Sequence, residues 1–522
     1  MLSDEQTRHA LRFSIWDGAF ATMMGSLCGG IFLVGFALNV LSATALQVGI
    51  LAALPVSANI AQLLGSLILE RFGHRRRLCV IWVTVARLFW VPILLLPLPL
   101  FAAWADTRIW LLIAFVGLSS LHGSMSGVAW LGWMSDLVPV NIRGRFFARR
   151  NMVAASAGMI TTLAGGALIN HWSTQHGRKH PLGYTLLFAI GLVLGLISSG
   201  FLARIPDPAP QARAEDAAKL TWGQLTQPLR DANFRTLLLY VCAFMFVTQM
   251  AGPFYAVYMI EDLNVDFSTL TLLITFATLA SLFMLRIWGP ISDQLGNKPI
   301  LMVAGFAHAL IPLVWVVAQD EIYYEALVLA HVLSGMFHAA ILLAHLNILM
   351  KLAPAEGRSF YIACFNSLIG LSVAAAPIFG GFLLERMAGL SFEIGGWTLS
   401  NLHLIFLLSG ALQLGVLLLL ARLHETNAAP SRAVLLQLRN DLDPQTGIAS
   451  ATDFITIRAG KTQHLLQRFD QRTDDWAARA EARVAKGLDL LSKRLRGPMA
   501  FLLDQPPPPP PAPPPPPPPP PP

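Results

Sequence analysis

The chain has 522 residues, of which 55% are hydrophobic and only 13% are charged, with a formal net charge of +7. Soluble domains carry about 25% charged residues, so this composition excludes a chain made mainly of soluble domains. The mean hydropathy of +0.57 instead indicates a protein built from membrane-spanning segments.

Twelve apolar stretches are long enough to cross a bilayer, since a membrane span needs about 18 or more apolar residues. Each must be a helix, because every backbone N–H and C=O in lipid needs a partner within the segment. The sequence therefore predicts an all-α membrane protein of twelve transmembrane helices. The stretches are 14–40, 48–69, 78–101, 109–134, 152–170, 183–203, 236–259, 268–288, 299–318, 323–349, 362–384 and 402–422.

The distribution of basic residues predicts the orientation of these helices. If both termini are cytoplasmic, nearly all of the 37 lysines and arginines lie inside, as the positive-inside rule requires. The exceptions are Arg87, Arg108, Arg178, Lys179 and Arg386. We therefore expect an integral protein of the cytoplasmic (inner, plasma) membrane, and we attribute the positive charge to topology rather than to nucleic-acid binding.

The N-terminus and the cysteines carry no processing or cofactor signal. Asp4 and Arg12 precede a first stretch that is too long for a cleaved signal peptide. The four cysteines form no C-x-x-C pair, so we expect small core residues, no metal site and no cofactor.

The chain contains an internal repeat. The block Glu70-x-x-Gly73-x-Arg75 recurs as Asp293-x-x-Gly296-x-Lys298, and a second block recurs in the same order further along the chain. A repeat of this length indicates one structural unit used twice, so we predict two like six-helix bundles, 1–204 and 235–423. The second block consists of Pro139, Arg143, Ala148, Asn151, Gly165, Gly166 and Leu168, which match Pro354, Arg358, Ala363, Asn366, Gly380, Gly381 and Leu383.

Three segments outside the bundles are polar or of low complexity. The stretch 205–234 is too polar to cross the bilayer and is expected to be a cytoplasmic linker. The tail, 424–505, contains an amphipathic helix between Leu465 and Leu495, which either binds the inner leaflet or packs on a protein surface. Residues 506–522 are proline except Ala512 and predict a polyproline II extension, with or without a binding partner.

The repeated acid–glycine–base motif ends spans two and eight, as Ser66 to Arg77 and as Gly289 to Lys298. It resembles the signature G-x-x-x-D-R-x-G-R-[RK] of the major facilitator superfamily (MFS), and the resemblance covers about residues 12–423. It implies the MFS fold of two pseudo-symmetric six-helix bundles that face each other across a shared interface. A glycine after the acid also permits a tight turn between two spans.

The same resemblance implies a gating role for the motif: Glu70, Gly73 and Arg75 in the first half, and Asp293, Gly296 and Lys298 in the second. In the family the basic residue pairs with an acid that ends span four, and Asp136 occupies that place here. In the second half the matching residue is Lys351, so this pairing is not expected there. Ser66 and Glu70 also depart from the family's glycine and aspartate, so the two gates are not expected to work alike.

The second repeated block joins two spans on the inside in each half. Its arginines, Arg143, Arg145 and Arg358, are expected to bind helix C-termini and rim acids rather than substrate. The glycine pairs Gly165/Gly166 and Gly380/Gly381 predict close helix approach in spans five and eleven.

Ionisable residues within spans are functional candidates, because charge is costly in lipid. Asp17 lies in span one, which the family resemblance places beside a central cavity where carboxylates often carry protons. The alternative is that Asp17 caps the start of its helix. Arg87 in span three needs a partner, and Asp17, a carbonyl or a water-lined pocket would each serve.

Polar residues on other spans are further candidates for proton or substrate handling. His331, His338 and His345 recur at seven-residue steps on one face of span ten, which the resemblance places at the cavity, and His122 lies on span four. They either titrate and bind a polar solute or form ordinary interhelical hydrogen bonds. On span seven the polar candidates are Gln249, Tyr255 and Tyr258.

These features predict a secondary active transporter, not an enzyme, that moves a small solute by alternating access and uses a proton gradient. Its expected partners are the bilayer, the solute and protons, with no nucleic acid. A P-loop is not expected, because Ile455 stands where its first glycine must be. The alternatives are a polytopic enzyme that acts on lipid-linked substrates and a non-transporting sensor or scaffold.

Overall fold

A computed structural model describes residues 4–442 except 73, 99–104, 140–141, 208–227, 320–321, 355–357, 395–396 and 427. Most of the linker, the expected amphipathic helix of the tail and the polyproline run therefore lie outside the described residues. The chain divides into two compact units, Met1–Leu438 and Arg439–Pro522, and all of the membrane helices belong to the first.

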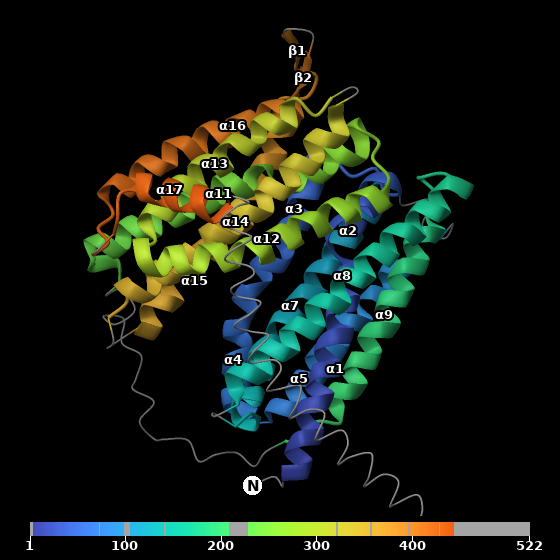
Figure 1. Ribbon diagram of the computed structural model, residues 1–522. Helices are drawn as coiled ribbons and strands as arrows, with labels where there is room; N and C mark the ends of the chain where they lie inside the picture. Colours follow the sequence, from blue (N-terminus) through green and yellow to red (C-terminus); the bar gives the residue numbers. More distant parts are fainter. Residues whose placement is uncertain are drawn as a thin grey trace, which may run out of the picture. The chain divides into compact units, whose positions relative to one another are not determined.

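Twelve helical segments of the described chain are long and apolar enough to cross a membrane, which confirms the predicted all-α membrane fold (Figure 1). In the first half they are α1 (Asp4–Cys28) with α2 (Gly30–Asn39), α3 (Ala45–Ser57) with α4 (Ala61–Phe72), α5 (Arg75–Leu88) with α6 (Trp90–Leu95), α7 (Ala105–Leu137), α8 (Arg143–His176) and α9 (Leu182–Ala203). In the second half they are α11 (Ala232–Val257), α12 (Phe267–Leu295), α13 (Lys298–Val316), α14 (Tyr323–Leu352), α15 (Arg358–Arg386) and α16 (Asn401–Leu417). After the last span, a short helix, α17 (Ser431–Leu442), follows.

Span one is broken in the middle, which the sequence analysis did not predict. Helix α1 ends at Cys28 and α2 begins at Gly30. Gly29 is extended, and Gly30 has a φ of +52°, a backbone conformation that favours glycine. The Gly29–Gly30 pair is the sequence signal for this break. The last C=O groups of α1 and the first N–H groups of α2 consequently have no intrahelical partner at this level.

A short β-hairpin interrupts the helical pattern between α15 and α16. Strands β1 (Ser391–Ile394) and β2 (Trp397–Ser400) pair antiparallel, with Ser391 opposite Ser400. A prediction of helices alone did not include these strands.

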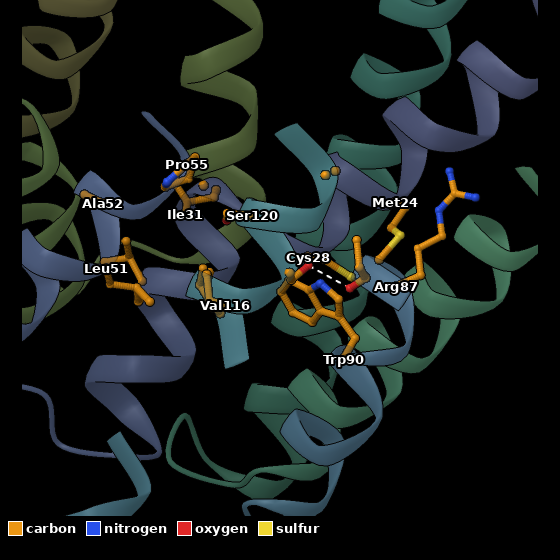
Figure 2. Close-up of a pocket in the computed structure, with 18 of the residues that line it drawn as sticks. Met24, Cys28, Ile31, Leu51, Ala52, Pro55, Arg87, Trp90, Val116 and Ser120 are labelled. Carbon is orange, nitrogen blue, oxygen red and sulfur yellow. Dashed lines mark hydrogen bonds between the residues drawn. The ribbon is translucent and has the colours of Figure 1, made fainter. Parts of the chain in front are cut away.

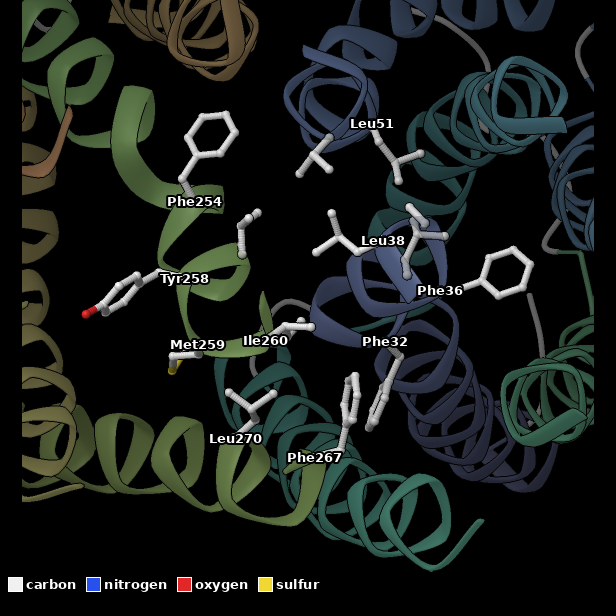
Figure 3. Packing of buried hydrophobic residues seen from close by; sticks show 14 of the residues in the cluster. Phe32, Phe36, Leu38, Leu51, Phe254, Tyr258, Met259, Ile260, Phe267 and Leu270 are labelled. Atoms are coloured by element: carbon white, nitrogen blue, oxygen red, sulfur yellow. The ribbon is translucent and has the colours of Figure 1, made fainter. Parts of the chain in front are cut away.

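The buried hydrophobic residues show that the two bundles are joined at one end. One cluster contains residues of both bundles near the connections 40–44, 177–181 and 263–266, which we call the joined end. There Phe32 of α2 stacks on Phe267 of α12, with ring centroids 6.1 Å apart (Figure 3). At the opposite end, near residues 74, 138–142 and 296–297, each bundle has its own cluster, and we call this the separate end.

Candidate functional site

The repeated glycines bring the two bundles together at the joined end. A Cβ on Gly166 of α8 would lie 2.6 Å from the carbonyl oxygen of Phe267 in α12. A Cβ on Gly381 of α15 would lie 2.5 Å from the carbonyl oxygen of Ala45 in α3. Both contacts cross between the bundles, and they occupy equivalent places in the two repeats. The glycines therefore allow close helix approach, as predicted, and the approach is between bundles.

The preceding glycine of each pair packs within its own bundle. A Cβ on Gly165 would lie 2.9 Å from the Phe32 ring of span one. A Cβ on Gly380 would meet Met250 and Phe254 of span seven. The first glycine of each pair thus packs its helix against the first span of its own bundle, which is span one or span seven. The second glycine packs the same helix against the opposite bundle.

Two polar contacts add to the joined end, and sequence reasoning missed both. The Leu46 N–H donates to Glu385 Oε1 at 3.3 Å across the bundles. Arg178, in the connection after α8, donates to the Ile260 carbonyl at 3.4 Å and to Asn264 Oδ1 at 3.3 Å. The sequence gave no indication of either contact, because in each case the partner is supplied by the other bundle.

At the separate end of the first bundle, the residues named by the motif lie together. Arg75 forms an ion pair with Asp136 and also donates to the Gly132 carbonyl at 3.2 Å. Arg143 donates to the carbonyls of Ser135 and Val138 at 2.8 and 3.3 Å, so it binds the C-terminal end of α7. Arg145 is exposed. Gly73 and the side chains of Glu70 and Arg358 lie outside the described residues.

The second bundle uses a different acid at its separate end. Glu425, which follows the last span, accepts hydrogen bonds from the Asn297 and Lys298 N–H groups at 2.8 and 2.6 Å. It also forms an ion pair with Lys351 Nζ at 2.7 Å. Gly296 makes the preceding turn with a φ of +87°, whereas Asp293 is exposed. Lys351 therefore has an acidic partner that comparison of the two repeats could not reveal, because Glu425 lies beyond the repeat.

These hydrogen bonds set the charge state of Glu425. Burial alone would raise the pKa of its carboxyl group, but hydrogen bonds from the Lys298 N–H, Lys351 and Asn297 outweigh burial. The pKa of Glu425 is consequently lowered from its ordinary value, and the ionised form caps the start of α13.

A buried charge network links four spans of the first bundle. Asp17 of α1 is only 4% exposed, and its Oδ1 accepts from Ser198 Oγ of α9 at 2.6 Å. Arg150 Nη2 of α8 lies 3.4 Å from Asp17 Oδ2. Arg87 of α5 donates to Ser198 Oγ at 2.8 Å and to Ser199, so it reaches Asp17 through a serine. Because α1 begins at Asp4, Asp17 is not at a helix start.

A cavity of about 610 Å³ lies beside this network, between spans one to four of the first bundle, and α11 also contributes to its wall (Figure 2). Arg87 belongs to both the network and the lining. The other lining residues are Ala21, Met24, Gly25, Cys28, Gly29, Gly30, Ile31, Leu33, Val34, Leu51, Ala52, Pro55, Val83, Ala86, Trp90, Val116, Ser119, Ser120, Gly123, Pro253 and Ala256.

The remaining polar candidates on spans four and seven are not among the residues that line this cavity. His122 Nδ1 is 2.9 Å from the Leu118 carbonyl of its own helix. Pro253 and Ala256 place one face of α11 at the cavity, and Tyr255 packs elsewhere, with its ring 4.3 Å from that of Phe406. Gln249 lies partly exposed on the same helix.

The histidine face of span ten points into the second bundle, contrary to the expected position at the cavity. The His331 ring lies 5.5 Å from that of Trp315, and the His338 ring lies 6.0 Å from that of His308, both partners being on α13. His345 is 4% exposed and lies beside Tyr240. The physical reason is packing, because α13 and α14 lie side by side along this face. His308, whose Nδ1 donates a 2.8 Å hydrogen bond to Gln413 Oε1, was missed although it is a polar residue in an expected span.

The twelve-helix fold, its internal repeat and the cavity beside the bundle interface define a membrane transporter. The chain belongs to the Major Facilitator Superfamily, whose sequence pattern matches residues 18–251 and 237–457. This finding confirms the predicted family.

Solved structures share this fold at low sequence identity. The nucleoside transporter NupG is 12% identical, with a TM-score of 0.56 over 80% of this chain and 98% of that one. A bacterial homologue of the human lysosomal transporter Spinster, inward-facing and unoccupied, is 16% identical, with a TM-score of 0.55 over 84% and 99%. A bacterial homologue of the iron transporter ferroportin, also inward-facing, is 14% identical, with a TM-score of 0.56 over 81% and 99%. No curated protein matches the chain.

Proposed function

We propose that the protein is a secondary active transporter that moves a small solute across the cytoplasmic membrane by alternating access, with both termini in the cytoplasm. The observation that carries this proposal is the asymmetry of the bundle interface. Hydrogen bonds and glycine contacts between the bundles lie at the joined end, whereas the ion pairs of the described separate end stay within one bundle.

The basic residues assign these ends to the two sides of the membrane. Arg75, Arg143 and Lys351 lie at the separate end, which the positive-inside rule places in the cytoplasm. With this orientation, we propose that the structure represents a state closed toward the outside, in which the two bundles are separate on the cytoplasmic side. Rocking of the two bundles about the joined end would produce the opposite state.

The ends of the motif helices are suited to hold each bundle rigid during this motion. The Arg75–Asp136 pair ties the start of α5 to the end of α7, and Glu425 ties α13 to α14. Asp293 is exposed and free to approach a helix N-terminus of the first bundle when the separate end closes. We assign the motif residues, including Glu70, Gly73 and Lys298, to this gate.

We assign proton coupling to Asp17. Its carboxylate joins span one to spans five and six through Arg150 and Ser198. Protonation removes the charge that Arg150 faces and weakens that link, which gives a proton a way to change how the helices around the cavity pack. Three of the other proton or substrate candidates, His122, His331 and His338, have their described ring contacts with other aromatic side chains, whereas Asp17 faces a charged arginine, so the histidines are second choices.

Two measurements test the proposal. Spin labels at Leu67 on α4 and Leu371 on α15, both exposed, should give two distance populations in lipid if the separate end opens and closes. Proteoliposomes with an imposed proton gradient should accumulate a solute from a panel of uncharged organic molecules that also contains a nucleoside and an iron salt, because the last two are named for the similar structures. A single fixed distance, together with no gradient-driven accumulation, would exclude alternating-access transport.

A further inference from the structure

The chemistry of the cavity wall is almost entirely hydrocarbon. Alanine, valine, leucine, isoleucine, methionine, proline and one tryptophan supply most of its side chains. The described residues of the lining include no carboxylate, no imidazole and no carboxamide. Its volume of about 610 Å³ is that of an ordinary site for a small organic molecule.

The few polar side chains of the wall are mostly occupied by protein partners. The Arg87 guanidinium donates to Ser198 and Ser199, and it is turned away from Cys28 and Trp90 (Figure 2). Ser119 Oγ donates to the Ala86 carbonyl at 2.8 Å. The groups that remain for a ligand are the Ser120 hydroxyl and the backbone at the break between α1 and α2.

We propose that this cavity binds an uncharged, mostly apolar organic molecule with one or two polar groups, which hydrogen-bond to Ser120 or to the backbone at Gly29–Gly30. The proposal rests on the transport function above, in that it names the class of substrate for the same protein. A polyhydroxylated solute such as a nucleoside would bury hydroxyl groups without partners here, which is unfavourable. Among the lining residues that the structure describes, a metal ion would find one thiol and no carboxylate or imidazole.

Two glycines in the wall allow this idea to be tested without disturbing the packing. A Cβ on Gly25 or on Gly123 would have no atom within 4 Å, so a larger side chain would grow into the cavity. Gly127 lies one turn further along α7, has equally open space and does not line the cavity. Gly123→Leu is therefore the test variant, and Gly127→Leu is its matched control.

The measurement is equilibrium binding of N-phenyl-1-naphthylamine, an uncharged aromatic probe that fluoresces in apolar surroundings, to the full-length protein in lipid nanodiscs. Partition of the probe into lipid is the same for every variant, so differences between variants report the cavity. We expect saturable binding to the wild type and to Gly127→Leu, and binding at least tenfold weaker to Gly123→Leu. If Gly123→Leu does not fold, Gly25→Leu replaces it.

Competition identifies the class of ligand. Excess 1-naphthol, which is uncharged, should displace the probe, whereas uridine, MnCl₂, benzoate and tetraphenylphosphonium should not. Equal binding by Gly123→Leu and the wild type, or displacement by any of the last four compounds, would overturn the proposal. Since binding is measured without flux, a failure of transport leaves this result intact, and the two proposals can fail separately.

Discussion

Gly381 of α15 lies so close to α3 that adding one methyl group, in Gly381→Ala, is expected to shift the equilibrium between the two states of the transporter. In Gly381→Ala the new Cβ would lie 2.5 Å from the Ala45 carbonyl oxygen and 2.8 Å from the Leu46 Cα, whereas ordinary contacts begin at 3.4 Å. Both neighbours are backbone atoms of the other bundle, so the bundles must move apart by several tenths of an ångström. Overpacking of this kind costs about 1–3 kcal/mol.

This cost applies only to the state in which the joined end is closed. If alternating access occurs, the methyl group has no such neighbour once the bundles separate there, and the equilibrium shifts toward the opposite state. Since about 1.4 kcal/mol corresponds to a tenfold change in an equilibrium constant, a cost of about 2 kcal/mol gives a shift of roughly thirtyfold. The matched control is Gly370→Ala on the same helix, where a Cβ meets nothing within 4 Å.

Spin labels at Thr174 of the first bundle and Ala388 of the second, both exposed at the joined end, provide the assay. The labels are placed in a background without the four native cysteines, and distances are measured in lipid. We expect a longer-distance population to grow in Gly381→Ala but not in Gly370→Ala. Identical distance distributions in the two variants would refute the reasoning that the glycine contact holds the joined end closed.

Three further predictions concern topology, coupling and the second gate. Reporter fusions at Arg145 should report cytoplasm and fusions at Gly177 the outside, and a cytoplasmic signal at Gly177 would contradict the proposed orientation. Asp17→Asn should abolish proton-driven accumulation in proteoliposomes and retain counterflow exchange, and retained accumulation would remove Asp17 from the coupling step. Because the pKa of Glu425 is lowered from 4.5, its stabilisation is present above that pH and is lost as pH falls through the folded pKa. Glu425→Gln should therefore lower stability by about 1–3 kcal/mol near neutral pH and flatten the acid side of a thermal-unfolding profile, whereas Glu393→Gln, an exposed control, should match the wild type.

The parts of the fold that were predictable from the sequence are those that depend on local composition. Apolar length locates each membrane helix, because a bilayer imposes the same requirement on every span. The repeat identifies Gly166 and Gly381 as equivalent, and the structure shows that both meet the opposite bundle. The break in span one was missed, although Gly29–Gly30 is visible, because a glycine pair in an apolar stretch is also compatible with close packing in an unbroken helix.

The partners of the polar residues were less predictable, because they depend on how the spans rotate. His338 lies on a face with His331 and His345, but the sequence does not say whether that face meets the cavity or α13. Arg87 was expected to need a partner, and two serines of α9 serve, linking it indirectly to Asp17. Serine is common in membrane helices and gives no signal in a search for buried charges.

The two ends of the bundle interface differ in how closely they follow the internal repeat. At the joined end each repeat contributes an equivalent glycine that touches the other bundle, so closing this end uses the symmetry of the fold. At the separate end the first repeat uses Asp136, whereas the second uses Glu425, which lies outside the repeat and directly precedes the segment that leads into α17. Val434 and Leu438 of α17 are buried in the core of the second bundle. A ligand that moves α17 would therefore also disturb the contacts of Glu425 with Lys298 and Lys351 in the second gate. The first gate has no described connection of this kind.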